Sequence, residues 1–214
     1  MTPIFISGIG TGVGKTLVSA IATEALHADY WKPIQAGYED GTDALRVKEL
    51  VSNPVTIIHP EAYMLRTPAS PHLASRKEKI TIDVNFIKTT FENLPVSNKF
   101  LVIEGAGGLM VPLNENEFVT DLIQKLSVPV ILVSQNYLGS INHSLLSAAI
   151  CKQKNIQVLG WIFNDQSAGY ETEIAHWSEY PLLASIPKFG TITKETVHRQ
   201  ALQIRERLLH LLGH

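Results

Sequence analysis

A lysine followed by a threonine closes a glycine-rich stretch near the start of the chain, and these residue types at this spacing are typical of phosphate binding. The stretch Gly8–Thr16 reads GIGTGVGKT and lies between a short apolar segment and a helical pattern. Backbone N–H groups of such a loop would face a polyphosphate, Lys15 would reach its β- and γ-phosphates, and the Thr16 hydroxyl would bind Mg²⁺. The usual motif has its first glycine at the position of Ile9, whereas here Gly8 begins the loop. A glycine-rich turn without a ligand is the alternative, but four glycines before Lys-Thr at a strand-to-helix junction favour nucleotide binding.

Two acidic residues stand where they could complete a metal site. Glu104 directly follows the apolar run Phe100–Ile103, at the place where P-loop proteins carry a metal-binding acid, and Asp43 follows a glycine-containing loop. Both carboxylates could bind Mg²⁺ together with Thr16, because Mg²⁺ prefers oxygen ligands. The structural alternatives are a strand-end carboxylate that accepts backbone hydrogen bonds for Glu104 and a helix N-cap for Asp43.

Other polar or glycine-rich segments also lie next to apolar runs. Lys32 lies in an otherwise apolar and aromatic strand. It could face the γ-phosphate from the side opposite Lys15 and stabilise charge during phosphoryl transfer, or it could extend from the strand end into solvent. Gly105–Gly108 could allow a phosphate or substrate to approach the backbone closely, or form a plain turn. Asn142 and His143 fall in a first helical turn, where capping explains them equally well.

The elements that must position these residues alternate along the chain. Apolar runs predict strands at residues 3–7, 29–33, 62–65, 100–103, 128–133, 157–163 and 183–186. Helical patterns cover residues 15–27, 42–50, 83–93, 120–126, 140–152, 170–179 and 196–212. Residues 34–41 and 67–72 are expected to be loops.

Repeated strand–loop–helix units predict the α/β class, with one domain over residues 1–214. The expected architecture is a P-loop NTPase-like, mostly parallel sheet with helices on both faces. Ligands of such sheets bind beyond the carboxyl ends of the strands. The glycine-rich loop, Lys32, Glu104 and the pair Asn164-Asp165 all fall at such ends, which favours one shared site.

Composition limits the possible partners and compartments. The 214 residues carry a net charge of −2 and no Lys/Arg run longer than two, so neither a nucleic-acid nor a membrane partner is expected. Cys151 is the single cysteine, which excludes an intrachain disulfide and suits a reducing compartment. The uncharged segment 126–151 is interrupted by polar residues, and no signal-peptide pattern is visible. We therefore expect a cytoplasmic protein.

Several motifs in order resemble the dethiobiotin synthetase family, and the resemblance spans almost the whole chain. They are GIGTGVGKT at 8–16, WKPIQAG at 31–37, the region of Asp43, TPASPH at 67–72, VIEGAGGLMVPL at 102–113, LGSINH at 138–143 and GWIFND at 160–165. The early first glycine also fits, because the loop of this family is one residue longer than usual.

The resemblance implies an ATP- and Mg²⁺-dependent ligase of biotin synthesis. Its substrate would be 7,8-diaminononanoate, one amine of which takes up CO₂ as a carbamate. The carbamate would attack the γ-phosphate of ATP to give a carbamic-phosphoric anhydride. The second amine would then close the ureido ring and release phosphate. Members of this family are homodimers.

The resemblance also assigns roles to residues of this sequence. Lys15 and Lys32 would be catalytic, and Thr16, Asp43 and Glu104 would hold Mg²⁺. The nucleotide would contact Gly12, Val13, Gly14, Lys15, Thr16, Leu17, Asp43, Glu104, Gly105, Ala106, Gly107, Asn164, Asp165, Pro187, Lys188 and Phe189. The substrate would contact Ala36, Gly107, Gly108 and, across the dimer interface, Asn142. At Ala36 the family often has a hydroxyl residue, so Gln35 or the backbone would have to replace that contact.

Two other classes of P-loop protein are alternatives. A MinD/ParA-type ATPase switch carries a second loop lysine five residues before the first, where this chain has Gly10. A small-molecule kinase usually places arginines over the phosphates, whereas the arginines here are scattered. Both observations favour the synthetase.

Overall fold

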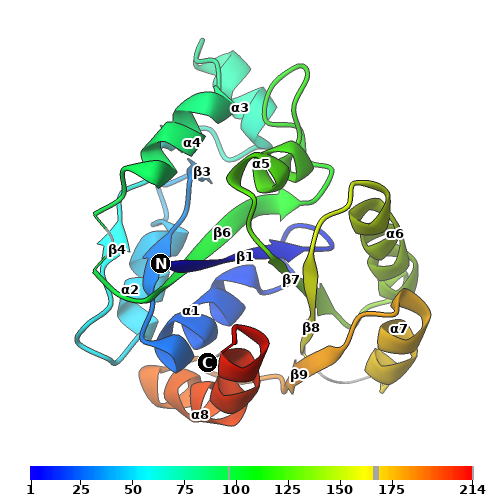
Figure 1. The fold of residues 1–214 in the computed structure, drawn as a ribbon. Helices are drawn as coiled ribbons and strands as arrows, with labels where there is room; N and C mark the ends of the chain where they lie inside the picture. The colour runs from blue at the N-terminus through cyan, green and yellow to red at the C-terminus, as the bar shows by residue number, and fades with distance from the viewer. Residues whose placement is uncertain (96, 166–168, 214) are drawn as a thin grey trace.

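The computed structural model describes residues 1–95, 97–165 and 169–213 (Figure 1). Its strands are β1 (Thr2–Gly8), β2 (Asp29–Trp31), β3 (Ile34–Ala36), β4 (Ile58–His59), β5 (Tyr63–Leu65), β6 (Phe100–Gly108), β7 (Val130–Gln135), β8 (Val158–Asn164) and β9 (Leu182–Ile186). Its helices are α1 (Lys15–Leu26), α2 (Asp43–Leu50), α3 (Pro71–Lys77), α4 (Val84–Glu92), α5 (Val119–Leu126), α6 (Ser140–Gln153), α7 (Glu171–Ser178) and α8 (Lys194–Leu211).

A seven-stranded sheet forms the centre of the molecule. The strand order is β4-β2-β6-β1-β7-β8-β9, and each neighbouring pair in it is parallel. α1, α2 and α8 cover one face, while α4, α5, α6 and α7 cover the other (Figure 1). The predicted α/β class, with a parallel sheet between two helical layers, is confirmed.

The side chains of the central strands alternate between the two faces. Ile4 and Ile6 of β1 pack on the side of α1 and α8, and Phe5 packs on the side of α4 and α5. All three are fully buried. A strand that is covered on both faces needs apolar residues in both directions, which explains why these strands appear as continuous apolar runs in the sequence.

The central strand β6 is longer than predicted. The apolar run suggested a strand that stops at Glu104, followed by a loop or turn at Gly105–Gly108, but β6 continues through these glycines. It keeps pairing with β1, with an irregularity between Ile6 and Gly8. A Cβ atom on Gly108 would lie only 3.3 Å from Gly8 O, so the absence of a side chain permits this close approach. The alternative of a plain turn at these glycines is therefore wrong.

Two segments predicted as loops contain regular structure. β3 lies in the segment 34–41 and pairs with β5 in a separate parallel sheet of two strands. α3 begins at Pro71, inside the predicted loop 67–72. Proline is well suited to the first helical turn, because it lacks the N–H that would have no partner there.

The uncharged segment 126–151 contains the end of α5, β7 and most of α6. Within the described residues, no helix is both long enough and apolar enough to span a membrane. Cys151 is fully buried in α6, and burial raises the pKa of its thiol to about 12. The thiol therefore stays protonated at neutral pH and contributes to packing.

Glu24 ties the C-terminal half of α1 to two neighbouring elements. Its carboxylate accepts hydrogen bonds from the backbone N–H groups of Ser52 and Asn53, at 2.8 and 3.0 Å, after α2. His198 Nδ1 of α8 lies 2.9 Å from Glu24 Oε1. Burial alone would raise the pKa of Glu24, but hydrogen bonds from Ser52, His198 and Asn53 lower it to about 2. The helix that follows the glycine-rich loop is thus anchored at its far end.

Candidate active site

The glycine-rich segment forms the connection between β1 and α1. Gly14 adopts a left-handed conformation with φ 92°, and a Cβ atom there would lie 2.1 Å from Asn164 Nδ2, so the position requires glycine. Asn164 Nδ2 donates to Val13 O at 3.3 Å. Lys15 is buried, and its Nζ donates to Gly10 O at 2.8 Å. The loop is therefore held by its own lysine and by the end of β8.

The positive charge of the Lys15 ammonium group is only partly balanced by the negative charges around it. Burial lowers its pKa to about 8, although the negative charge of Glu104 acts in the opposite direction. Lys32 lowers the pKa further, and Asp43 raises it. Because an adjacent anion stabilises the charged form of a lysine, a phosphate group entering the loop would be attracted to this cation.

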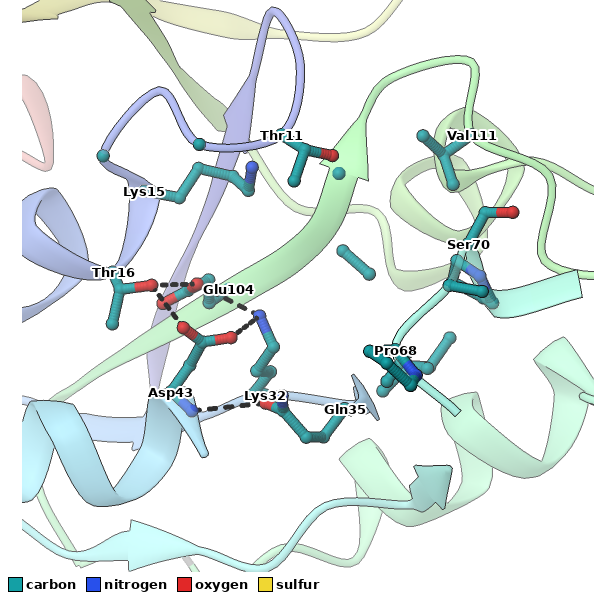
Figure 2. Close-up of a pocket in the computed structure, with 18 residues that line it drawn as sticks. Thr11, Lys15, Thr16, Lys32, Gln35, Asp43, Pro68, Ser70, Glu104 and Val111 are labelled. Carbon is teal, nitrogen blue, oxygen red and sulfur yellow. Dashed lines mark hydrogen bonds and ion pairs between the residues drawn. The ribbon is translucent and has the colours of Figure 1, made fainter. Parts of the chain in front are cut away.

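Three oxygen-bearing side chains meet at the floor of a cleft beside the loop (Figure 2). Thr16 Oγ1 lies 2.6 Å from Asp43 Oδ1 and 3.0 Å from Glu104 Oε1. The three residues come from the starts of α1 and α2 and from the middle of β6. A set of hydroxyl and carboxylate oxygens is the kind of donor set that Mg²⁺ prefers.

Lys32 joins this cluster from the end of β2. Its Nζ lies 2.9 Å from Asp43 Oδ2 and 3.1 Å from Glu104 Oε1, and only 5% of its side chain is exposed. Burial alone would lower the pKa of Lys32, but the adjacent Glu104 and Asp43 carboxylates outweigh that effect and raise it. Lys32 thus does not extend into solvent. Within the described residues no backbone N–H donates to Glu104, so the strand-end alternative is also wrong.

Asp43 is not the N-cap of α2. That position is occupied by Thr42, whose side chain accepts a hydrogen bond from Leu45 N at 3.1 Å. Burial alone would raise the pKa of Asp43, but Lys32 and the Thr16 hydroxyl hold it below its ordinary value. The carboxylate is therefore negatively charged at neutral pH and faces the cleft.

Two further buried side chains support the carboxylates, namely Gln35 and Tyr30, and no role was predicted for Tyr30 from the sequence. The Tyr30 hydroxyl donates to Glu104 Oε2 at 2.9 Å, and burial, with the charges of Glu104 and Asp43, raises the pKa of Tyr30 well above its ordinary value. Gln35 accepts a hydrogen bond from Asp43 N at 3.3 Å and donates to Gly37 O at 2.7 Å. Each polar atom of the Gln35 amide thus makes one hydrogen bond inside the chain, which leaves one N–H and one oxygen lone pair on the cleft wall. In the sequence, the one feature that could have indicated this role of Tyr30 was its place as a phenol in a short apolar strand that ends at a lysine.

The cleft has a volume of about 650 Å³ and brings together much of the predicted site. The predicted residues on its wall are Gly12, Gly14, Lys15, Thr16, Lys32, Ala36, Asp43, Glu104, Ala106 and Gly107. Those outside its lining are Val13, Leu17, Gly105, Gly108, Asn142, Asn164, Asp165, Pro187, Lys188 and Phe189. Gly108 and His143 line a neighbouring, mainly apolar cavity of about 480 Å³. Asn142 is exposed in the first turn of α6 and lines neither cavity.

The remaining predicted residues lie at the carboxyl ends of β8 and β9. Asn164 is the last residue of β8, and Pro187–Phe189 follow β9 directly. Lys188 Nζ lies 3.4 Å from Asp165 Oδ2, so the two segments are neighbours. Through the contact of Asn164 with Val13, they also border the glycine-rich loop.

Comparison with known proteins identifies the family. A family model described as an AAA domain matches residues 2–196. The ATP-dependent dethiobiotin synthetase BioD of Cytophaga hutchinsonii is 46% identical over 206 residues, which cover 95% of this chain and 97% of that protein. The chain belongs to the dethiobiotin synthetase family. The ATP-dependent dethiobiotin synthetase BioD of Christiangramia forsetii is also 46% identical, over 208 residues that cover 97% of this chain and 98% of that protein. The predicted resemblance is therefore confirmed.

Solved structures show how this dethiobiotin synthetase family member is related in fold to other P-loop proteins. The septum site-determining protein MinD from Pyrococcus horikoshii, complexed with Mg-ADP, superposes with a TM-score of 0.61. The match covers 99% of this chain and 94% of that one, at 17% sequence identity. Such a low identity establishes the P-loop NTPase-like fold alone.

Proposed function

We propose that this chain is a single-domain, ATP-dependent dethiobiotin synthetase that joins 7,8-diaminononanoate and CO₂ into the cyclic urea of dethiobiotin. The observation that carries the proposal is the convergence of Lys15, Lys32, Asp43 and Glu104 on one cleft, in a chain 46% identical to named dethiobiotin synthetases. Phosphoryl transfer depends on fixed charges around the moving group, and two lysines beside two carboxylates can supply them.

Mg²⁺ and the triphosphate of ATP fit the residues at the floor of the cleft. The oxygen atoms of Thr16, Asp43 and Glu104 are suitable magnesium ligands, and the ammonium group of Lys32 between the carboxylates supports the view that this position attracts cations. Bound there, Mg²⁺ would neutralise negative charge on the β- and γ-phosphates. The triphosphate would follow the loop Gly12–Leu17.

The adenine would lie beside the ends of β8 and β9. Asn164 would bind it through the side-chain amide, and Pro187–Phe189 would form an adjacent wall. Asp165 would border the same site, and its ion pair with Lys188 joins the two segments. On the opposite side of the loop, the end of β6 at 105–107 would approach the phosphates.

The proposed reaction begins when one amine of the substrate adds to CO₂ and loses a proton, which gives a carbamate. A carbamate oxygen attacks the γ-phosphorus of ATP, the bond to the bridging oxygen breaks, and ADP leaves. The second amine then attacks the carbamate carbon, closes the ring and releases phosphate. Lys15 and Lys32 would stabilise the negative charge of the phosphoryl group during its transfer.

The substrate would lie along the wall formed by Ala36 and Gly107, towards Gly108. Because Ala36 has no hydroxyl, polar contacts from this wall would come from the backbone or from the second N–H and second lone pair of the Gln35 amide. The adjoining mainly apolar cavity suits the methylene chain of the diamine.

A homodimer would complete this site. Asn142 is exposed on α6, next to two large apolar side chains, Leu138 and Leu146, that are 102% and 61% exposed. A second copy of the chain that covers these residues would remove apolar surface from water and carry Asn142 towards the substrate carboxylate of its partner. We expect the reaction to take place in the cytoplasm, where ATP is available.

The test is the release of phosphate from MgATP with bicarbonate, in the presence and absence of the diamine. We expect release only with the diamine, together with a product whose mass matches the cyclic urea. Rapid ATP hydrolysis without the diamine, or phosphorylation of an unrelated alcohol, would contradict the proposal.

A further inference from the structure

A buried phenol that does not line the cleft contacts the acidic cluster. Tyr30 is the middle residue of β2 and is fully buried. β2 pairs with β6 so that Tyr30 lies opposite Val102, and Glu104 is two residues further along β6. Residues two apart in a strand point to the same face, so Tyr30 and Glu104 are diagonal neighbours on the side of the sheet that α1 covers.

The two oxygen atoms of the Glu104 carboxylate have different partners. Oε2 accepts a hydrogen bond from the Tyr30 hydroxyl at 2.9 Å. Oε1 lies 3.0 Å from Thr16 Oγ1 and 3.1 Å from Lys32 Nζ, at the floor of the cleft. Because Glu104 is only 1% exposed, solvent does not supply an alternative partner for Oε2. The Tyr30 hydroxyl is thus in a position to fix how the carboxylate plane is turned.

We propose that Tyr30 is a positioning residue for the metal site, because its hydroxyl holds the Glu104 carboxylate with Oε1 directed towards Thr16 and Asp43. This inference rests on the proposed function, in which Glu104 is a magnesium ligand. Hydrogen bonds to the outer atoms of metal ligands fix their orientation, and their loss commonly weakens metal binding by about 10- to 100-fold. Were the ring needed only for packing, the hydroxyl could be removed without effect on the metal.

The test is Tyr30→Phe, which removes the hydroxyl and keeps the ring in place. ATP binding is measured by calorimetry across a Mg²⁺ titration and again in EDTA. We expect the Mg²⁺ concentration for half-maximal enhancement of ATP binding to rise by about tenfold or more. ATP affinity in EDTA should change less than about twofold, because the glycine-rich loop is intact.

Tyr63→Phe is the matched control. The Tyr63 hydroxyl accepts a hydrogen bond from Asp83 N at 3.0 Å, and Tyr63 does not line the cleft. The control loses one phenol hydrogen bond of similar length, so it should bind ATP with the wild-type Mg²⁺ dependence. A Tyr30→Phe protein that melts at a lower temperature but keeps the wild-type Mg²⁺ dependence would overturn the inference and leave only a packing role.

Glu104→Gln separates this inference from the proposed function. Glu104→Gln is expected to shift the Mg²⁺ dependence of ATP binding. The double variant Tyr30→Phe/Glu104→Gln should show little further shift, because Tyr30 acts through Glu104. If Glu104→Gln shifts the dependence and Tyr30→Phe does not, the inference fails and the proposed metal site remains. If Glu104→Gln itself has no effect, the metal role of Glu104 and the inference fail together.

Discussion

The ammonium group of Lys32 lies 3.1 Å from Glu104 Oε1, and both side chains are almost completely buried. The same nitrogen lies 2.9 Å from Asp43 Oδ2, so one cation lies between two carboxylates that would otherwise repel each other. Charges in a buried site are tolerated only when they are paired. Lys32 thus contributes both to the stability of the metal-free cluster and, in the proposed reaction, to the stabilisation of the phosphoryl group.

Lys32→Gln tests both contributions. We expect kcat to fall by roughly 10²–10³, the usual effect of losing one preorganised charged contact in a transition state. In EDTA the variant should also lose about 3 kcal/mol of unfolding free energy, because two carboxylates are left without their counter-ion. Mg²⁺ should restore part of that loss. Steady-state kinetics and urea unfolding with and without Mg²⁺ measure the two effects.

Lys48→Gln serves as the control for that variant, since Lys48 is an exposed lysine on α2. It should match the wild type in kcat and in unfolding free energy to within about 0.5 kcal/mol. An unchanged kcat in Lys32→Gln would remove Lys32 from the catalytic residues.

Asp43→Asn should raise the Mg²⁺ concentration needed for half-maximal turnover by about tenfold or more, because an amide is a weaker magnesium ligand than a carboxylate. The control is Asp40→Asn, in the segment that precedes α2, where the side chain is exposed. Turnover measured across a Mg²⁺ titration distinguishes the two variants. Equal titration curves for both would contradict a metal role for Asp43.

Ala36→Ser introduces a hydroxyl on the cleft wall, at the position where the family resemblance led us to expect one. A new hydrogen bond to the diamine contributes about 1 kcal/mol, so KM for the diamine should fall by roughly fivefold. KM for ATP should stay the same, because position 36 lies on the proposed substrate side. If KM for the diamine is unchanged while the variant is fully active, the substrate does not contact this wall through a side chain.

The network around Glu24 predicts a dependence of stability on pH. The pKa of Glu24 is lowered from an ordinary 4.5 to about 2 in the folded chain, so the stabilisation is complete above pH 4.5 and is lost as the pH falls towards 2. Between pH 6 and pH 3 the wild type should lose about 2 kcal/mol more unfolding free energy than Glu24→Gln does. Urea unfolding at several pH values measures the difference. Parallel pH curves for the two proteins would contradict this account.

The sequence predicted those parts of the molecule that depend on local patterns. Continuous apolar runs located β1, β7 and β8 to within about two residues, and the glycine-rich motif located the loop before α1. The rule that ligands bind at the carboxyl ends of parallel strands brought Lys32 and Glu104 to one site before any contact was known. These predictions succeeded because periodicity and strand direction alone decide them.

The features that were missed depend on partners far away in the sequence. β3 exists because it pairs with β5, and no pattern within residues 34–36 signals that pairing. The glycines at the end of β6 have low strand propensity and Gly107 has a positive φ of 69°, so only the pairing of Gly108 with Gly8 of β1 shows that the strand continues. Tyr30 resembles any core aromatic residue until the diagonal position of Glu104 is known.

The helix α1 is held at both of its ends. The backbone of Gly14 lies against Asn164 at the N-terminal end, and Glu24 bonds the segment after α2 and helix α8 at the other. Eleven of its twelve residues are buried, which leaves it no free side along which to tilt or slide. In the proposed site, the side of the cleft that would face the phosphates is therefore fixed in place. Adjustment to successive ligands would then fall to the segment before α2, where Gly37 and Gly41 turn the chain with positive φ.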